Sequence, residues 1–114
     1  MRDSILQTLR AMLGPSVSDA YTAFDTELIA HINTVLMILY QVGIGQKGFR
    51  ITGETETWGD FLGTATNLEA VKSFVYLRVK MLFDPPSSSF VLESMKTSAE
   101  ELLWRLNVEV DPES

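Results

Sequence analysis

The segment from Gly43 to Gly48 contains the pattern G-x-G-x-x-G. This pattern binds the pyrophosphate of dinucleotides when it follows a β-strand and opens a helix. Here the apolar spacing predicts a helix before the pattern and a loop after it, and no Asp or Glu lies on a second strand at the distance expected for ribose binding. The G-K-[ST] ending of a phosphate-binding loop is also missing. The sequence therefore does not predict a nucleotide site.

His31 is the only histidine, and Glu27 lies about one helical turn before it. General acid–base catalysis needs a reacting group positioned beside the base, and zinc needs several converging ligands. Two residues on one helix face supply neither. We interpret His31 as a packed or surface residue.

Three carboxylates, Glu54, Glu56 and Asp60, follow the glycine pattern. Paired carboxylates can perform acid–base chemistry, but in a glycine-rich exposed loop they more often keep the loop soluble. We therefore predict no catalytic residue, no metal site and no cofactor, and we expect that the protein is not an enzyme.

Large aromatic side chains stand at places where burial is hard to arrange from the sequence alone. Aromatic residues and arginine at half-exposed positions are typical anchors of protein–protein interfaces. The alternative is that the aromatic rings cap the ends of a helical bundle. The candidate interface residues are Phe49, Arg50, Trp58, Phe61 and Trp104.

The totals describe an acidic chain of ordinary globular composition. Its 114 residues, 46% of them hydrophobic, predict a single domain over 1–114 with a real core. The formal net charge of -6 argues against a surface that neutralises nucleic-acid phosphates or anionic lipid. Because the chain has no cysteine, disulfides and thiolate metal sites are excluded, which fits a reducing cytoplasm.

The apolar spacing predicts an all-α fold, a small bundle of four main helices at about 2–13, 25–42, 67–83 and 88–106. The third of these is apolar on most sides, so we expect it in the middle of the bundle. It is too charged to span a membrane.

Two helix starts carry capping signals. Asp25 is a suitable N-cap for the second helix, and the run from Thr66 to Glu69 matches a capping box for the third.

The glycine-rich loop at 43–63 holds six of the seven glycines. Within it, Phe49 to Thr52 alternates as a short strand would, which allows a short β-hairpin, and one helical turn is predicted from Trp58 to Leu62. A loop this long in a compact domain is usually functional or mobile. Residues 107–114 are predicted to form an acidic, flexible tail.

The assembled motifs resemble a family, the head–tail connector (adaptor, or head-completion) proteins of tailed phages, as found in phages and prophages of Gram-positive bacteria. The similarity covers nearly the whole chain. It lies in an opening Asp3-x-Ile5 helix that ends in Leu13-Gly14, in Phe24-Asp25-x-x-Leu28-x-x-x-Ile32-Asn33, in the segment 36–49, in the run 53–58, in the hairpin 83–90 and in Glu101-Leu102-x-Trp104-Arg105-Leu106-Asn107.

The resemblance implies a structural virion protein without catalytic residues. Copies would form a homo-oligomeric ring, commonly a dodecamer, docked on the portal protein and followed by a downstream tail or stopper protein. DNA would pass through the channel without sequence-specific binding, and no membrane is involved. The protein would be at the head–tail junction of the virion, and in the host cytoplasm during assembly. The 43–57 part of the loop is long enough to reach a neighbouring subunit or the portal.

Two alternatives remain open. A DNA-packaging protein that resembles a small terminase subunit would need a basic recognition helix, and Lys72, Arg78 and Lys80 lie among positions predicted to be buried. A prophage regulator acting through helix–helix contacts is the second alternative.

Overall fold

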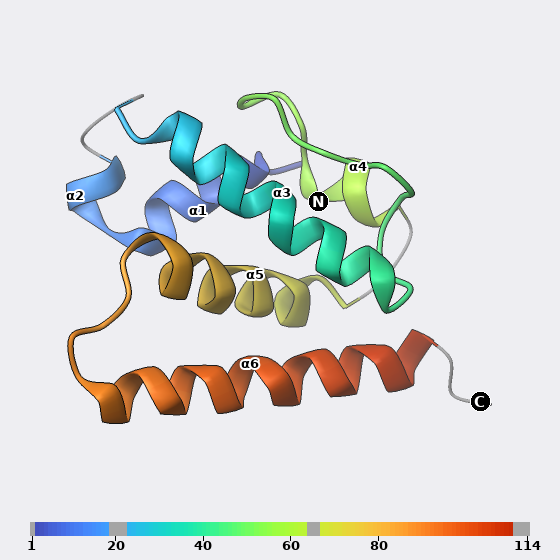
Figure 1. Cartoon of the computed structure of the whole chain (residues 1–114). Coiled ribbons are helices and arrows are strands. Elements are labelled where there is room, and N and C mark those ends of the chain that lie inside the picture. Colours follow the sequence, from blue (N-terminus) through green and yellow to red (C-terminus); the bar gives the residue numbers. More distant parts are fainter. Residues whose placement is uncertain (1, 19–22, 64–66, 111–114) are drawn as a thin grey trace.

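The computed structural model describes residues 2–18, 23–63 and 67–110. The chain folds as an all-α bundle, which confirms the predicted fold class (Figure 1). Its four long helices are α1 (Ile5–Leu13), α3 (Asp25–Gln41), α5 (Leu68–Phe83) and α6 (Ser89–Val110). Two short helices, α2 (Pro15–Ser18) and α4 (Trp58–Leu62), complete the fold; α4 was predicted as one turn, whereas α2 was not predicted.

Helix α5 is the centre of the bundle. It packs against α6 on one side and against α3 and α1 on the other, as Figure 1 shows. Its buried side chains are Val71, Phe74, Val75 and Val79. The prediction that the 67–83 helix lies in the middle is confirmed.

The helix ends differ from the sequence predictions in three places. Asp25 is the first residue of α3 and not its N-cap, because its carboxylate binds Arg10 instead; Phe24 occupies the cap position. At the start of α5 the cap position belongs to Asn67, without a side-chain hydrogen bond, and Thr66 lies outside the described residues. The capping box is found at α4, where Thr57 and Asp60 bind each other's backbone N–H groups.

Helix α6 continues beyond its predicted end near residue 106. It ends at Val110, so the first part of the predicted tail at 107–114 is helical. The Asn107 side-chain amide donates a hydrogen bond to the carbonyl of Val42, 3.3 Å away, and thereby joins α6 to the end of α3. Residues 111–114 lie outside the described part of the chain.

The predicted β-hairpin in the 43–63 loop is not formed. Within residues 2–18, 23–63 and 67–110 the structure has no β-strand, and only an isolated bridge pairs Ser4 with Thr57. The segment 43–57 is irregular, yet it buries Ile44 and Ile51 in the core. Hydrogen bonds from side chains, and not a β-sheet, hold this segment against the helices.

Asn33 on α3 makes the first of these contacts, with the backbone of Ile51. Its side-chain amide donates to the carbonyl of Ile51 at 3.0 Å and accepts from the Ile51 N–H at 2.7 Å. An amide side chain offers one donor and one acceptor in the arrangement of a peptide group, so Asn33 pairs with Ile51 as a neighbouring strand would.

Arg10 on α1 makes the second of these contacts and is the only buried charged side chain that the described part of the chain contains. Its guanidinium donates two hydrogen bonds to Asp25, at 3.1 and 2.6 Å, and one to Glu54. The hydrogen bond to Asp25 raises the pKa of Arg10, although burial opposes the shift. Because paired carboxylates compensate this buried charge, Arg10 ties α1, α3 and the loop together.

Glu56 closes a turn inside the loop. Its carboxylate accepts hydrogen bonds from the Thr52 hydroxyl at 2.7 Å, the Thr52 N–H at 3.1 Å and the Gly53 N–H at 3.3 Å. Burial raises the pKa of Glu56, but these hydrogen bonds, with one from its own backbone, lower it more. The pKa of Glu56 therefore lies below its ordinary value of 4.5.

Gly45 sits against the ring of Phe61 and has a φ of +90°, a conformation that favours glycine. A Cβ at this position would overlap the Phe61 ring. Phe61 in turn contacts Phe49, with ring centroids 5.2 Å apart. The loop therefore follows a path that only glycine permits at this point.

We expect Gly45→Ala to lower the free energy of unfolding by about 2–5 kcal/mol, from backbone strain and from overpacking against Phe61. The matched control is Gly48→Ala, because Gly48 also has a positive φ, +70°, but has open space where the Cβ would be. The control should cost only about 1–2 kcal/mol. Urea denaturation measures both, and equal losses would show that the loop does not pack on Phe61 as described.

Glu56 should contribute to acid sensitivity. A carboxylate with a lowered folded-state pKa stabilises the fold above its unfolded-state pKa, and this contribution is lost as the pH falls through the folded-state value. We expect Glu56→Gln to lower the Tm at pH 7, with the difference from the natural chain shrinking as the pH falls below 4.5. Glu69→Gln, at an exposed position, is the control. A Glu56→Gln difference that does not change with pH would contradict the described turn.

Candidate functional site

The carboxylates and glycines that first suggested a catalytic or nucleotide site have structural roles in the fold. Glu54 binds Arg10, Glu56 closes the loop turn and Asp60 caps α4. The glycine pattern follows the end of α3 and does not open a helix, and the Phe61 ring fills the space beside Gly45. No group of three potential metal ligands occurs within the described ranges.

Two of the predicted interface residues are core residues. Trp58 and Phe61 are fully buried within the chain itself. The Trp58 indole N–H donates to the Thr8 hydroxyl at 3.0 Å, which satisfies its polar atom on α1. Because α4 folds back over the end of the bundle, these rings cannot be offered to a partner in this conformation. The burial of both rings agrees with the alternative that they cap the bundle, and their role at an interface stays a prediction.

The other three predicted residues reach the surface. Phe49 is half-buried, whereas Arg50 and Trp104 are exposed. They belong to two different places, because Phe49 and Arg50 lie in the loop beside α3 and Trp104 lies on α6.

The first place is an open groove of about 570 Å³ between the exposed side of α3 and the loop. Its apolar lining comes from Ile29, Met37 and Tyr40 on α3 and from Phe49 on the loop, with Arg50 at its edge. Met37 is 54% exposed and Tyr40 41% exposed, which is high for large apolar side chains. We call this feature the α3 groove.

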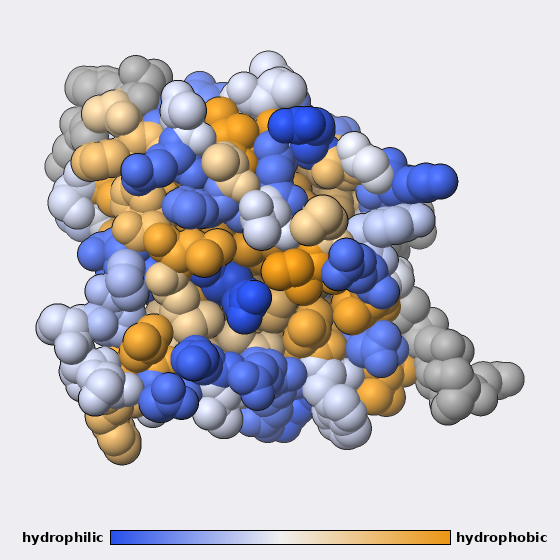
Figure 2. All heavy atoms as spheres, viewed as in Figure 1, coloured by the Kyte–Doolittle hydropathy of each residue, from blue (hydrophilic) through white to orange (hydrophobic). Residues whose placement is uncertain are grey.

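Figure 2 shows hydrophobic residues gathered on one face of the molecule over α3 and α5, and many hydrophilic residues along α6. Exposed apolar surface with a polar border is typical of contact sites for other proteins.

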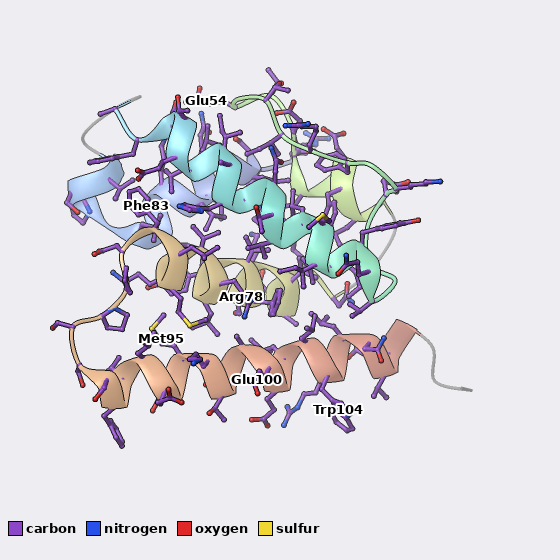
Figure 3. The ribbon with its side chains drawn as sticks, in the orientation of Figure 1. Glu54, Arg78, Phe83, Met95, Glu100 and Trp104 are labelled. Atoms are coloured by element: carbon purple, nitrogen blue, oxygen red, sulfur yellow. The ribbon has the colours of Figure 1, made fainter. Side chains whose placement is uncertain are left out.

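The second place is the side of α6 that points away from α5. Figure 3 shows Met95 on the side facing α5 and Trp104 on the opposite side. Trp104 is 66% exposed and Phe90 is 79% exposed. With Thr97, Glu100, Glu101 and Val108 they share one side of the helix, by the spacing of three and four residues. We call this set the α6 outer face.

The sequence analysis missed Met37, Tyr40 and Phe90. Spacing gave no clear signal for Met37 and Tyr40, because apolar residues lie on most sides of α3. Met37 and Tyr40 are exposed, whereas the apolar residues on the opposite part of α3 belong to the core.

Comparison with known proteins gives one match. Residues 5–113 match the family model described as phage connector protein. No curated protein and no solved structure matches the chain. The helices that the structure describes include none long and apolar enough to cross a membrane. The family match covers almost the entire chain and agrees with the resemblance carried by the sequence motifs, so the chain belongs to the phage connector protein family.

Proposed function

We propose that this protein is a head–tail connector that docks on the portal and forms a ring around the path of the DNA. Family membership supports a structural role in the virion. The observation that favours assembly is that large apolar side chains are exposed at two separate places, the α3 groove and the α6 outer face, although the chain also buries a hydrophobic core.

The shape of the molecule suits a ring subunit. Its extents are 44 × 36 × 19 Å, so it is a flat slab and not a sphere. Flat protomers with different contact surfaces can pack side by side around an axis, and such head-to-tail contacts close into rings when the rotation permits. The number of subunits, a dodecamer by resemblance, stays a prediction.

The negative net charge agrees with the proposal that DNA passes through the ring without being bound tightly. The formal net charge is -6. An acidic channel wall would not release counterions from DNA, so the duplex could slide.

A small-terminase-like DNA binder is less well supported. Of the basic residues on α5, Lys72 lies 3.9 Å from the Asp3 carboxylate and Lys80 binds Asp84 at 2.8 Å. Helix α5 is also covered by α3 and α6, so it is not free to enter a DNA groove. No structural observation favours a prophage regulator.

The proposal is tested by mixing the purified chain with the portal protein and measuring the mass of the complexes by size-exclusion chromatography with light scattering. We expect the chain to elute with the portal, several copies per portal ring. An unrelated acidic protein of similar size, mixed in the same way, controls for nonspecific attraction.

Elution of the chain as a monomer both alone and with portal would contradict the proposal. A gel shift at low salt distinguishes the alternative, since tight DNA binding that weakens steeply with salt would favour the DNA-binding function.

A further inference from the structure

The α3 groove and the α6 outer face carry complementary side chains: apolar and basic residues in and beside the groove, and aromatic and acidic residues on the helix. We propose that they bind each other in neighbouring copies, so that Trp104 of one subunit enters the α3 groove of the next. This inference rests on the proposed ring and names the contact that builds it.

The groove side offers an apolar floor with a basic edge. Its floor includes Met37, whose flexible side chain adapts to a partner's shape. Lys47 and Arg50 are exposed on the loop beside it, and neither forms an ion pair with a residue that the structure describes. Two unpaired positive charges next to an apolar groove favour an acidic, aromatic partner.

The α6 outer face has those properties. Trp104 is the kind of residue that most often anchors an interface. Glu100 lies one turn before it and forms no ion pair within the described ranges, whereas Glu101 binds Arg105 at 2.8 Å. The helix spans 22 residues, about 33 Å, which exceeds the 19 Å thickness of a subunit.

A single chain cannot make this contact with itself. Trp104 points away from α5 and therefore away from the rest of the chain (Figure 3). The groove is lined by α3 and the loop, without any residue of α6. The two surfaces share no residue, so a head-to-tail contact between them leaves one free groove and one free α6 outer face, and such a contact propagates from copy to copy as a ring requires.

The groove has room for the indole. Its volume of about 570 Å³ lies within the range of sites that hold compact organic groups. A tryptophan that loses its exposed surface in such a groove removes a large apolar area from water, and the surrounding charges fix the orientation.

We expect Arg50→Glu and Glu100→Arg each to raise the protein concentration needed for half-maximal self-assembly about tenfold. Light scattering measures this concentration, with the portal or with the chain alone at high concentration. In the proposed contact Arg50 of one copy faces Glu100 of the next, so the double variant should restore most of the loss, because it rebuilds this ion pair with its charges exchanged. Trp104→Ala should weaken assembly by about 30-fold or more. Leu82→Ala, which alters an apolar side chain 49% exposed and outside both surfaces, is the control for Trp104→Ala.

Cysteine cross-linking identifies the contact directly, because the natural chain has no cysteine. The double variant Arg50→Cys with Glu100→Cys should give a ladder of covalent multimers under mild oxidation, up to the full ring. Each single variant should give no ladder, since one cysteine per chain can link at most two copies. Arg50→Cys with Glu69→Cys is the matched control and should stay unlinked.

The outcomes separate this contact from the ring itself. Assembly with portal but no ladder above the control, and no rescue by charge exchange, would overturn the contact while the proposed function stands; the α6 outer face would then face the portal or tail protein. Absence of assembly with and without portal would overturn both.

Discussion

The position of the 43–57 loop, and with it the shape of the surface beside α3, depends on the two hydrogen bonds between Asn33 and Ile51. Ile51 is buried, but the loop that carries it joins no sheet, so its backbone N–H and C=O need partners inside the molecule. Asn33 satisfies both from α3. Without it, the loop would have to leave the core or bury unpaired polar groups, which costs about 1–3 kcal/mol each. Because Phe49 and Arg50 directly precede Ile51, this pairing also sets one wall of the α3 groove.

Two further contacts hold the same loop, one with α1 and one with α4. Arg10 binds Glu54 while also binding Asp25, and Gly45 lets the chain pass close to Phe61. The 43–57 segment is thus a fixed part of the protomer. It exposes Arg50, places Phe49 in the lining of the α3 groove and keeps Ile44 and Ile51 in the core. A fixed surface loses less conformational entropy on binding than a free arm would.

The sequence was sufficient for the helices and insufficient for the loop, for a physical reason. Helices α3 and α5 repeat apolar residues with helical spacing, and this information is local. The burial of Trp58 and Phe61 depends on where α4 lies against α1, which is tertiary information. The same is true of Asp25, whose carboxylate was expected to cap a helix and instead binds Arg10 from another helix. Trp104 could be predicted as exposed because its neighbours on α6 are polar, whereas Met37 and Tyr40 could not be separated from the core stripe by spacing alone.

Membership in the phage connector family gives these surfaces their meaning. A subunit of the proposed ring would need a folded core of its own and also contacts that are completed only in the assembly. Different parts of this chain serve the two needs. Helix α5 and the 43–57 loop complete the core, whereas the outer sides of α3 and α6 are exposed in the described structure. The α3 groove is preformed only if the loop that lines it is held firmly in the free protein.

Native-state hydrogen exchange at the Ile51 amide of the free chain tests this claim most directly. Exchange as slow as that of the buried α3 amides, such as those of Ile32 and Val35, is expected, because the Asn33 acceptor and the surrounding core must open together before the amide meets water. Exchange near the rate of an unprotected amide, with α3 still slow, would contradict it, because the loop would then detach while the helices stay folded.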